Sequence, residues 1–389
     1  MALNPKLSIT ERDRRYGVLR RQLRQRAVDC TIVSGSNLFY LSNGIPGELY
    51  GLLTTDEKPF TVIVNRRHLV DVPVRVLVDA QDWVGDFRPG NDAAPLIEKV
   101  KELGLEKGTV GLSGGISYRF YTQLQSALPA AKIVDVTDIF TDVRTLKSAE
   151  ENAMIDRANG VFDAAIKRIH EVARPGMTGV EVVREGIRAM WEAGGDLDST
   201  LSFNFGPVPA QNPILGELCM ERRIQKGDIG TLTAHAEYGH YAGHSDQEIS
   251  FGAPRALHQE MFRAVISVRD EVLKQVREGA TQRDLIDAYR KACKETGFKP
   301  SPHSQIHQYG IDVPEFPGPA YRIADPRPDG GPLGGAGNFT LKNGMIYSIS
   351  PTIVAKDGGD TLLGGTSLVV TATGYRDHGE RKVEMLVAA

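Results

Sequence analysis

Cysteine, long apolar runs and an excess charge of either sign are what this sequence lacks. Its three cysteines (Cys30, Cys219 and Cys293) are too few and too scattered for a disulfide framework or a zinc knuckle, so we expect buried thiols in a reducing compartment. The first residues are polar and charged, unlike a signal peptide, and no run of about 18 apolar residues follows. A formal net charge of -3 gives no electrostatic case for nucleic acid or an anionic membrane. We therefore expect a cytoplasmic protein.

What is present is an ordinary globular composition over 389 residues, with 41% hydrophobic and 24% charged residues. That length is sufficient for two domains. The first part of the chain predicts helices at residues 9–27, 93–103 and 118–128, and strands at 30–33, 50–53, 60–64, 75–77, 109–112 and 132–136. Such alternation is typical of an α/β domain, which we place at residues 1–143.

The second domain, residues 144–389, begins with a helix whose start is marked by Ser148 and Glu151, which form a capping box. A turn at residues 174–178 lies between two helices, and a similar turn recurs between two helices at residues 277–281. Each second helix is followed by strand-rich sequence. This internal similarity indicates two α/β halves, so the predicted fold class is α/β (α+β).

The stretch at residues 226–251, KGDIGTLTAHAEYGHYAGHSDQEISF, carries most of the candidate chemistry. Three histidines fall among Glu237, Asp246 and Glu248 on two strand-like runs that meet near Tyr238 and Gly239. If the runs pair as a hairpin there, Thr233 lies roughly opposite His244. The two-residue period of a strand then puts His244 and Asp246 on one face.

This pattern resembles the signature hairpin of the creatinase/methionine-aminopeptidase superfamily, whose members have the "pita-bread" fold. The matching positions are Gly227-Asp228, Ala236-Glu237-Tyr238 and Tyr241. Residues 36–44 (SNLFYLSNG) resemble the N-terminal domain of creatinase and aminopeptidase P, and residues 144–151 (RTLKSAEE) resemble the phrase that opens their catalytic domain. The resemblance implies a small N-terminal creatinase-type α/β domain followed by a pita-bread domain of two pseudo-repeated halves.

The resemblance also implies five metal-ligand positions, and this chain departs from the family at four of them. Where the family has Asp, Asp, His, Glu and Glu to hold two divalent ions, this chain has Thr233, His244, His307, Ser350 and Gly365. These positions supply no carboxylate, so we expect no dinuclear metal centre and no cofactor. Creatinase is the family member that works without metals, by acid–base groups alone, on a C–N bond of a small guanidino compound.

Two imidazoles remain at the expected centre, and we predict that His244 and His307 act as general base and acid. Asp246 is predicted to orient His244, as a carboxylate does in the dyads of other hydrolases. The sequence leaves open whether Asp246 or Glu248 faces the pocket.

Six further residues are predicted to bind substrate. Gln211 takes the place of the catalytic His in creatinase's Ala-His-Asn-Pro run, and Arg322, in the Gly/Pro-rich residues 317–337, is suited to clamp a carboxylate. Glu48 lies where creatinase carries Arg, in the loop that closes the pocket of the other subunit, which favours a substrate with a positive group there. The other three are Thr233, Glu315 and Ser350.

Together these residues predict a homodimeric, metal-independent, creatinase-like hydrolase that cleaves a C–N bond in a small polar metabolite. Three alternatives remain open from the sequence. The first is a lyase that abstracts a proton α to a carboxylate on the same scaffold. The second is a hydrolase with one metal ion held by His244 and His307, with or without Asp246. The third is a non-catalytic pita-bread module used for binding.

Overall fold

The computed structural model describes residues 6–70, 76, 81–206, 220–301, 304–321 and 340–389. Contacts within the chain divide it into two units, Lys6–Arg144 and Thr145–Ala389, which we describe separately. No helix in these described ranges is long and apolar enough to cross a membrane.

The N-terminal unit is built on a six-stranded sheet with the strand order β4-β3-β2-β1-β5-β6. Helices α5 and α6 cover part of this sheet through Leu96, Phe120 and Leu124, which join one buried cluster with strand residues such as Ile32. The elements in chain order are α1 (Ile9–Gln25), β1 (Cys30–Val33), α2 (Gly35–Ser42), β2 (Glu48–Thr54), β3 (Thr61–Asn65), α3 (Arg66–Val70), β4 (Asp86–Gly90), α5 (Ala94–Glu102), β5 (Thr109–Ser113), α6 (Tyr118–Ala127), β6 (Lys132–Asp135) and α7 (Thr137–Thr145).

Most of these elements match the sequence-based prediction, and the exceptions are α2, α3, β4 and α7. Strand β4 was not predicted because its sequence, DFRPG, contains Pro and Gly and shows no apolar alternation. It lies at the edge of the sheet, where proline is tolerated. Helix α2 lies mostly within residues 36–44, which carry the family resemblance and for which no helix was predicted. The strand predicted at residues 75–77 falls almost entirely outside the described residues.

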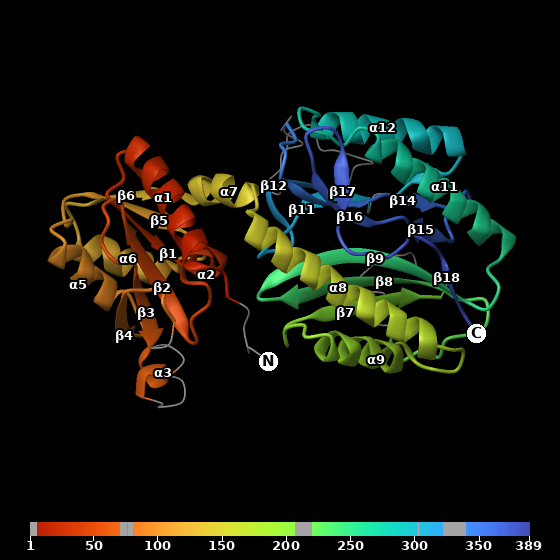
Figure 1. Ribbon diagram of the computed structural model, residues 1–389, viewed down its shortest axis with the longest axis horizontal. Coiled ribbons are helices and arrows are strands. Elements are labelled where there is room, and N and C mark those ends of the chain that lie inside the picture. The colour runs from red at the N-terminus through yellow and green to blue at the C-terminus, as the bar shows by residue number, and fades with distance from the viewer. Residues whose placement is uncertain (1–5, 71–75, 77–80, 207–219, 302–303, 322–339) are drawn as a thin grey trace. The chain divides into compact units, whose positions relative to one another are not determined.

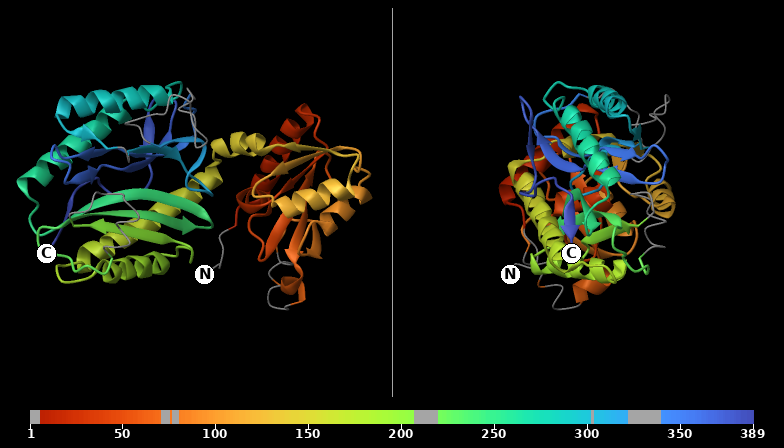
Figure 2. Two further views of the ribbon diagram at one scale, coloured as in Figure 1. Left: turned by 180° about the vertical axis from the view of Figure 1, so that it is seen from behind. Right: turned by 90° about the vertical axis from the view of Figure 1, so that its right-hand side faces the viewer.

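The C-terminal unit contains two larger sheets, each covered on its outer face by a pair of helices. Helices α8 and α9 pack on the sheet β18-β9-β8-β7, and α11 and α12 pack on the sheet β12-β11-β13-β16-β17 (Figures 1 and 2). A small third sheet has the order β10-β14-β15. The two helix-covered halves confirm the predicted pita-bread architecture.

The elements of this unit in chain order are α8 (Ala149–Val172), α9 (Gly179–Glu192), β7 (Thr200–Phe205), β8 (Ile229–Tyr238), β9 (Tyr241–Phe251), α11 (Ala256–Leu273), α12 (Gln282–Thr296), β10 (Lys299–Pro300), β11 (Gln305–Gln308), β12 (Glu315–Tyr321), β13 (Ile346–Ser350), β14 (Thr352–Val354), β15 (Thr361–Leu363), β16 (Thr366–Val370), β17 (Tyr375–Asp377) and β18 (Leu386–Ala388).

Helices α8, α9 and α12 each begin with a capping box, as the sequence indicated for α8. The side chains of Ser148 and Glu151 form a capping box at the start of α8. The two recurring turns each end in a threonine cap, Thr178 for α9 and Thr281 for α12, and both of these also complete a capping box. Such caps satisfy backbone N–H groups that have no partner within the helix.

The β8–β9 hairpin forms, but its turn lies one residue later than predicted. Gly239 and His240 have φ angles of 61° and 60°, as in the two-residue turns that suit the twist of a hairpin. Moving the turn by one residue moves each cross-strand partner by two. Thr233 therefore lies opposite Asp246, and not opposite His244. A shift of two residues leaves every side chain on the predicted face.

Strand β9 approaches the backbone of α8 closely at Gly243. A Cβ atom at this position would lie 2.5 Å from the carbonyl carbon of Ala158 and 2.5 Å from the nitrogen of Asn159. Backbone atoms cannot move aside as the end of a side chain can, so only glycine allows this separation between helix and strand.

We therefore expect Gly243→Ala to lower the free energy of unfolding of the C-terminal unit by about 1–3 kcal/mol, through overpacking. The matched control is Gly160→Ala in α8, where an added Cβ meets nothing within 4 Å. That change is expected to raise stability by about 0.5–1 kcal/mol, because glycine weakens a helix interior. Urea denaturation monitored by circular dichroism measures both, and equal effects of the two changes would contradict this account of the packing.

Candidate active site

The candidate site lies in a polar seam where the inner faces of the two sheets meet. Strand β9 contacts β13, β15 and β16 across this seam. The side chains that β8 and β9 direct into it form three cross-strand pairs, which are Thr231 with Glu248, Thr233 with Asp246, and His235 with His244. His307 of β11 and Ser350 of β13 face them from the other sheet. Both Asp246 and Glu248 thus lie on the seam side, which the sequence had left open.

The carboxylate of Asp246 lies in the middle of the seam, and each of its two oxygens accepts a hydrogen bond from a hydroxyl group. The Thr233 hydroxyl donates a hydrogen bond of 2.6 Å to Oδ1, and the Ser350 hydroxyl donates one of 2.8 Å to Oδ2. A Cβ atom at Gly365 would lie only 2.4 Å from Oδ2. Thr233, Ser350 and Gly365 are three of the five positions where the family resemblance implied metal ligands. Their side chains instead hold, or leave room for, one carboxylate.

The two predicted catalytic imidazoles lie next to each other. The ring centroids of His244 and His307 are 5.0 Å apart, and the His235 ring lies 4.6 Å from that of His244. Nδ1 of His244 is 3.0 Å from the Ala234 carbonyl oxygen, and Nδ1 of His307 is 3.1 Å from the Gln308 carbonyl oxygen. Because a carbonyl oxygen only accepts, both Nδ1 atoms carry the proton and both Nε2 atoms keep a lone pair.

Burial and mutual repulsion keep the two imidazoles neutral. Burial lowers the pKa of His244 to about 3, with a smaller contribution from neighbouring His235. Burial also lowers the pKa of His307 to about 3, with repulsion from His244 in the same direction and the negative charge of Asp246 opposing it. Both rings are therefore proton acceptors at neutral pH.

The structure corrects the role predicted for Asp246 as the group that orients His244. The backbone carbonyl of Ala234 orients that ring, while the Asp246 oxygens accept from Thr233 and Ser350. Burial raises the pKa of Asp246, and the two hydroxyls, Arg381 and His307 act in the opposite direction.

Glu248, two residues further along β9, differs from Asp246 in its hydrogen bonds. Its Oε1 accepts hydrogen bonds of 2.8 Å from the Thr231 hydroxyl and from the Leu363 N–H. Its Oε2 is buried without a partner among the described residues. Burial raises the pKa of Glu248 to about 8, so this carboxyl is protonated at neutral pH. Asp246 and Glu248 are therefore not interchangeable.

Of the remaining predicted substrate-binding residues, Glu315 and Glu48 lie among the described residues. Glu315 is buried and receives hydrogen bonds from Lys147 Nζ at 2.7 Å and from the N–H groups of Ile311 and Asp312. These contacts give it a structural role, tying the start of β12 to the segment before α8. Gln211 and Arg322 lie outside the described residues.

Glu48 belongs to the N-terminal unit and not to the seam. Its carboxylate accepts a hydrogen bond of 3.2 Å from the Ile45 N–H within its own loop. Burial raises its pKa to about 7.

None of the five positions where the resemblance implied metal ligands supplies a carboxylate, and the carboxylate that lies between them, Asp246, accepts hydrogen bonds from two hydroxyl groups. This set of side chains differs from the carboxylate-rich set that holds two divalent ions. Among the described residues, the set that brings three potential ligand atoms within 4.8 Å of one another is Asp196, Glu237 and His240, at the tip of the hairpin. His244, His307 and Asp246 do not form such a set in the described part of the chain.

Comparison with known proteins identifies both units. The family described as "Metallopeptidase family M24" matches residues 153–373, and "Creatinase/Prolidase N-terminal domain" matches residues 15–146. A Xaa-Pro dipeptidase from Pyrococcus horikoshii is 22% identical over 87% of this chain and 91% of that protein. A creatinase from a Bacillus species is 23% identical over 97% of this chain and 89% of that protein. The structure of a Xaa-Pro dipeptidase from Bacillus anthracis superposes with a TM-score of 0.80 at 20% identity, covering 97% of this chain and 99% of that one.

The close approach of Gly365 to Asp246 gives a direct test of the seam. We expect Gly365→Ala to displace the Asp246 carboxylate and to lower the free energy of unfolding by about 1–3 kcal/mol. Gly364→Ala is the matched control, because a Cβ there would meet its nearest atoms at 3.4 Å, an ordinary contact. Replacing Asp246 by Ala in the Gly365→Ala background should remove the clash, so a double-mutant cycle measured by denaturation should show strong coupling. Additive effects would mean that Asp246 does not occupy the space beside Gly365.

Proposed function

The chain belongs to metallopeptidase family M24, and we propose that it is a metal-independent member that hydrolyses a C–N bond in a small polar metabolite. The observation that carries the proposal is the Asp246 carboxylate, hydrogen-bonded to Thr233 and Ser350, two of the positions where the resemblance implied metal ligands. Two neutral imidazoles lie beside it with free Nε2 lone pairs. Peptidase chemistry in this family depends on metal ions, whereas creatinase-type chemistry depends on acid–base groups.

The proposed reaction needs only the groups in the seam. Nε2 of one imidazole removes a proton from water while the water oxygen bonds to the substrate carbon. The resulting imidazolium then gives that proton to the leaving nitrogen as the C–N bond breaks. An imidazole whose resting pKa is near 3 is a weak base, but its conjugate acid is a strong proton donor.

Asp246 has a defined part in this cycle. Its negative charge favours a positive charge on His307. We therefore assign His307 as the ring that becomes cationic, with Asp246 as its electrostatic partner across the seam and His244 as the second proton carrier.

Replacing His307 by Ala should lower kcat by about 100- to 10,000-fold, the usual contribution of a general acid–base group. His240→Asn is the matched control, because His240 lies in the hairpin turn with a φ of 60° that asparagine also adopts. It should leave kcat unchanged. Activity should be measured on the full chain after dialysis against EDTA, with creatine, other small amidino and amide compounds and Xaa-Pro dipeptides as substrates.

The same assay separates the alternatives. Incorporation of oxygen from labelled water into the product supports hydrolysis, and its absence in a product with a new double bond supports a lyase. Loss of activity in EDTA, with restoration by one equivalent of a divalent ion, would overturn the metal-independent proposal. Near wild-type turnover by the His307→Ala variant would overturn the acid–base assignment.

We also propose that the protein is a homodimer in which the N-terminal unit of one subunit closes the pocket of the other. Glu48 supports this proposal, because it begins β2 next to the loop that the family resemblance assigns to that contact, and desolvation raises the pKa of its carboxyl to about 7. Analytical ultracentrifugation should give about twice the 42.5 kDa of one chain. Glu48→Gln should raise KM with little change in kcat, whereas a monomer with wild-type activity would contradict the proposal.

A further inference from the structure

Arg381, in the segment between β17 and β18, contacts the strand that carries the candidate catalytic residues. Its Nη1 donates to the Asp246 carbonyl oxygen at 2.8 Å and to Gln247 Oε1 at 2.6 Å, and its Nη2 donates to Ser245 Oγ at 2.5 Å. Its Nε is 3.3 Å from Asp163 Oδ1 of α8. One guanidinium group thus engages three consecutive residues of β9.

Burial and stacking hold this side chain in one place. The Arg381 side chain is 15% exposed, and its guanidinium carbon lies 4.9 Å from the centre of the Phe162 ring. Planar guanidinium groups suit such a position because stacking leaves their N–H groups free to donate in the plane.

The hydrogen-bonding pattern of β9 explains why the strand needs this contact. On the side away from β8, strand β18 pairs with β9 only from Ile249 to Phe251. The edge at Ser245–Gln247 lies beyond that ladder, and a buried backbone carbonyl without a partner is costly. Arg381 supplies the donor that a neighbouring strand would otherwise give to Asp246.

The charge of Arg381 acts on the same residue. Burial raises the pKa of Asp246, and the positive charge of Arg381 is one of the influences that oppose this rise. The side chain therefore favours the ionised carboxylate through space and also fixes its backbone.

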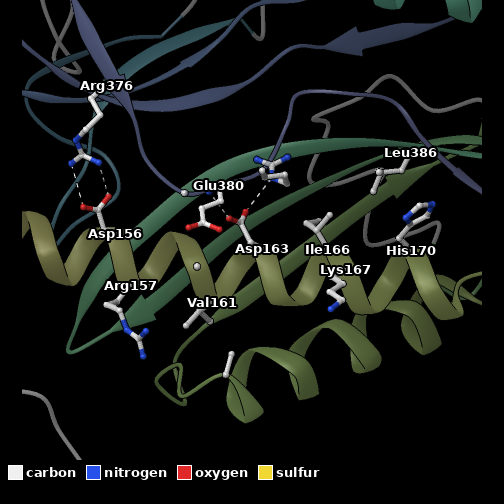
Figure 3. Close-up of a pocket in the computed structure, with 14 residues that line it drawn as sticks. Asp156, Arg157, Val161, Asp163, Ile166, Lys167, His170, Arg376, Glu380 and Leu386 are labelled. Atoms are coloured by element: carbon white, nitrogen blue, oxygen red, sulfur yellow. Dashed lines mark hydrogen bonds and ion pairs between the residues drawn. The ribbon is translucent and has the colours of Figure 1, made fainter.

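A cavity of about 830 Å³ is lined in part by Arg381. It is lined by α8 and by residues of the C-terminal segment, including Asp156, Asp163, Arg376 and Glu380 (Figure 3). Arg376 binds Asp156 at 3.1 and 3.2 Å in the same cavity but bonds to no residue of β9. The cavity gives a small cation access to the position of the Arg381 guanidinium, and Arg376 provides a matched control.

We propose that Arg381 is the positioning residue of the active site, which fixes β9 at Ser245–Gln247 and so holds the Asp246 carboxylate facing His307. The proposal rests on the proposed hydrolase function for its kinetic consequence. Its structural consequence, the state of Asp246, is independent of any substrate.

The kinetic test is chemical rescue. Arg381→Gly should lower kcat about a hundredfold, the scale expected when a catalytic group is misplaced by about 1 Å, with little change in KM. Guanidinium chloride at millimolar, non-denaturing concentration should restore a saturable part of the loss, because the ion can enter through the cavity. Arg376→Gly should retain wild-type kcat and show no response to guanidinium. An unchanged kcat in Arg381→Gly, or an equal response of both variants to guanidinium, would overturn the proposal.

A second measurement needs neither a substrate nor the glycine variant. Titration of the ¹³C-labelled Asp246 carboxyl, identified by its loss in Asp246→Asn, should show a higher pKa in Arg381→Met than in wild type. Arg381→Lys should stay close to wild type because it keeps the charge. If Arg381→Met titrates like wild type, Arg381 does not set the state of Asp246 and the proposal fails. If wild type turns over no compound tested while this difference appears, the proposed function fails and the positioning role stands.

Discussion

The C-terminal unit depends on how one buried carboxylate is accommodated between two sheets. A charge taken out of water costs several kcal/mol unless hydrogen bonds and opposite charges replace its hydration. Asp246 receives both from separate parts of the chain. Hydroxyls come from Thr233 in the first half and Ser350 in the second. Arg381, near the C-terminus, donates to the Asp246 backbone carbonyl oxygen, and its positive charge acts on the carboxyl through space. Groups from both halves therefore stabilise the same side chain at the candidate site.

The positions around Asp246 form a coupled set. A carboxylate at position 365 could not coexist with Asp246, because even a Cβ there would lie 2.4 Å from Oδ2. Carboxylates in place of Thr233 and Ser350 would bring like charges against it and remove its two hydroxyl donors. Small and hydroxyl-bearing residues at these positions are therefore consequences of Asp246. This coupling offers one physical explanation for the departures from the family pattern that the resemblance implies.

The fold could be predicted from sequence because its signals are local. Capping residues such as Ser148 and Thr281 mark helix starts within three residues, and hairpin alternation fixes which side chains share a face. The register of the hairpin was wrong by one turn residue, since both Tyr238-Gly239 and Gly239-His240 are plausible turns on local grounds. Only the cross-strand pairing of Tyr238 with Tyr241 decides between them.

The partners within the site could not be predicted in the same way. Ser350 is 104 residues from Asp246 and Arg381 is 135 residues from it, so no local pattern links them. Arg381 lies in no recognisable motif, so nothing in the sequence marks it as a candidate site residue. The orienting role predicted for Asp246 followed the common carboxylate–histidine dyad, but in this structure backbone carbonyls orient both imidazoles. Side-chain pairs in the two sheets depend on tertiary register, which a single sequence does not specify.

The electrostatics of the seam set a requirement on any substrate. Two imidazoles with pKa values near 3 and a protonated Glu248 leave Asp246 as the acidic group that faces His307 among the described seam residues, and burial raises the pKa of this carboxyl as well. A water molecule gives up its proton to such weakly basic rings only if the resulting cation is stabilised, and Asp246 is placed to do so. Excluding bulk water from the seam during turnover strengthens the interaction between Asp246 and the His307 cation, because water otherwise screens it. The proposed acid–base reaction therefore requires a substrate that excludes bulk water from the seam while the reaction proceeds.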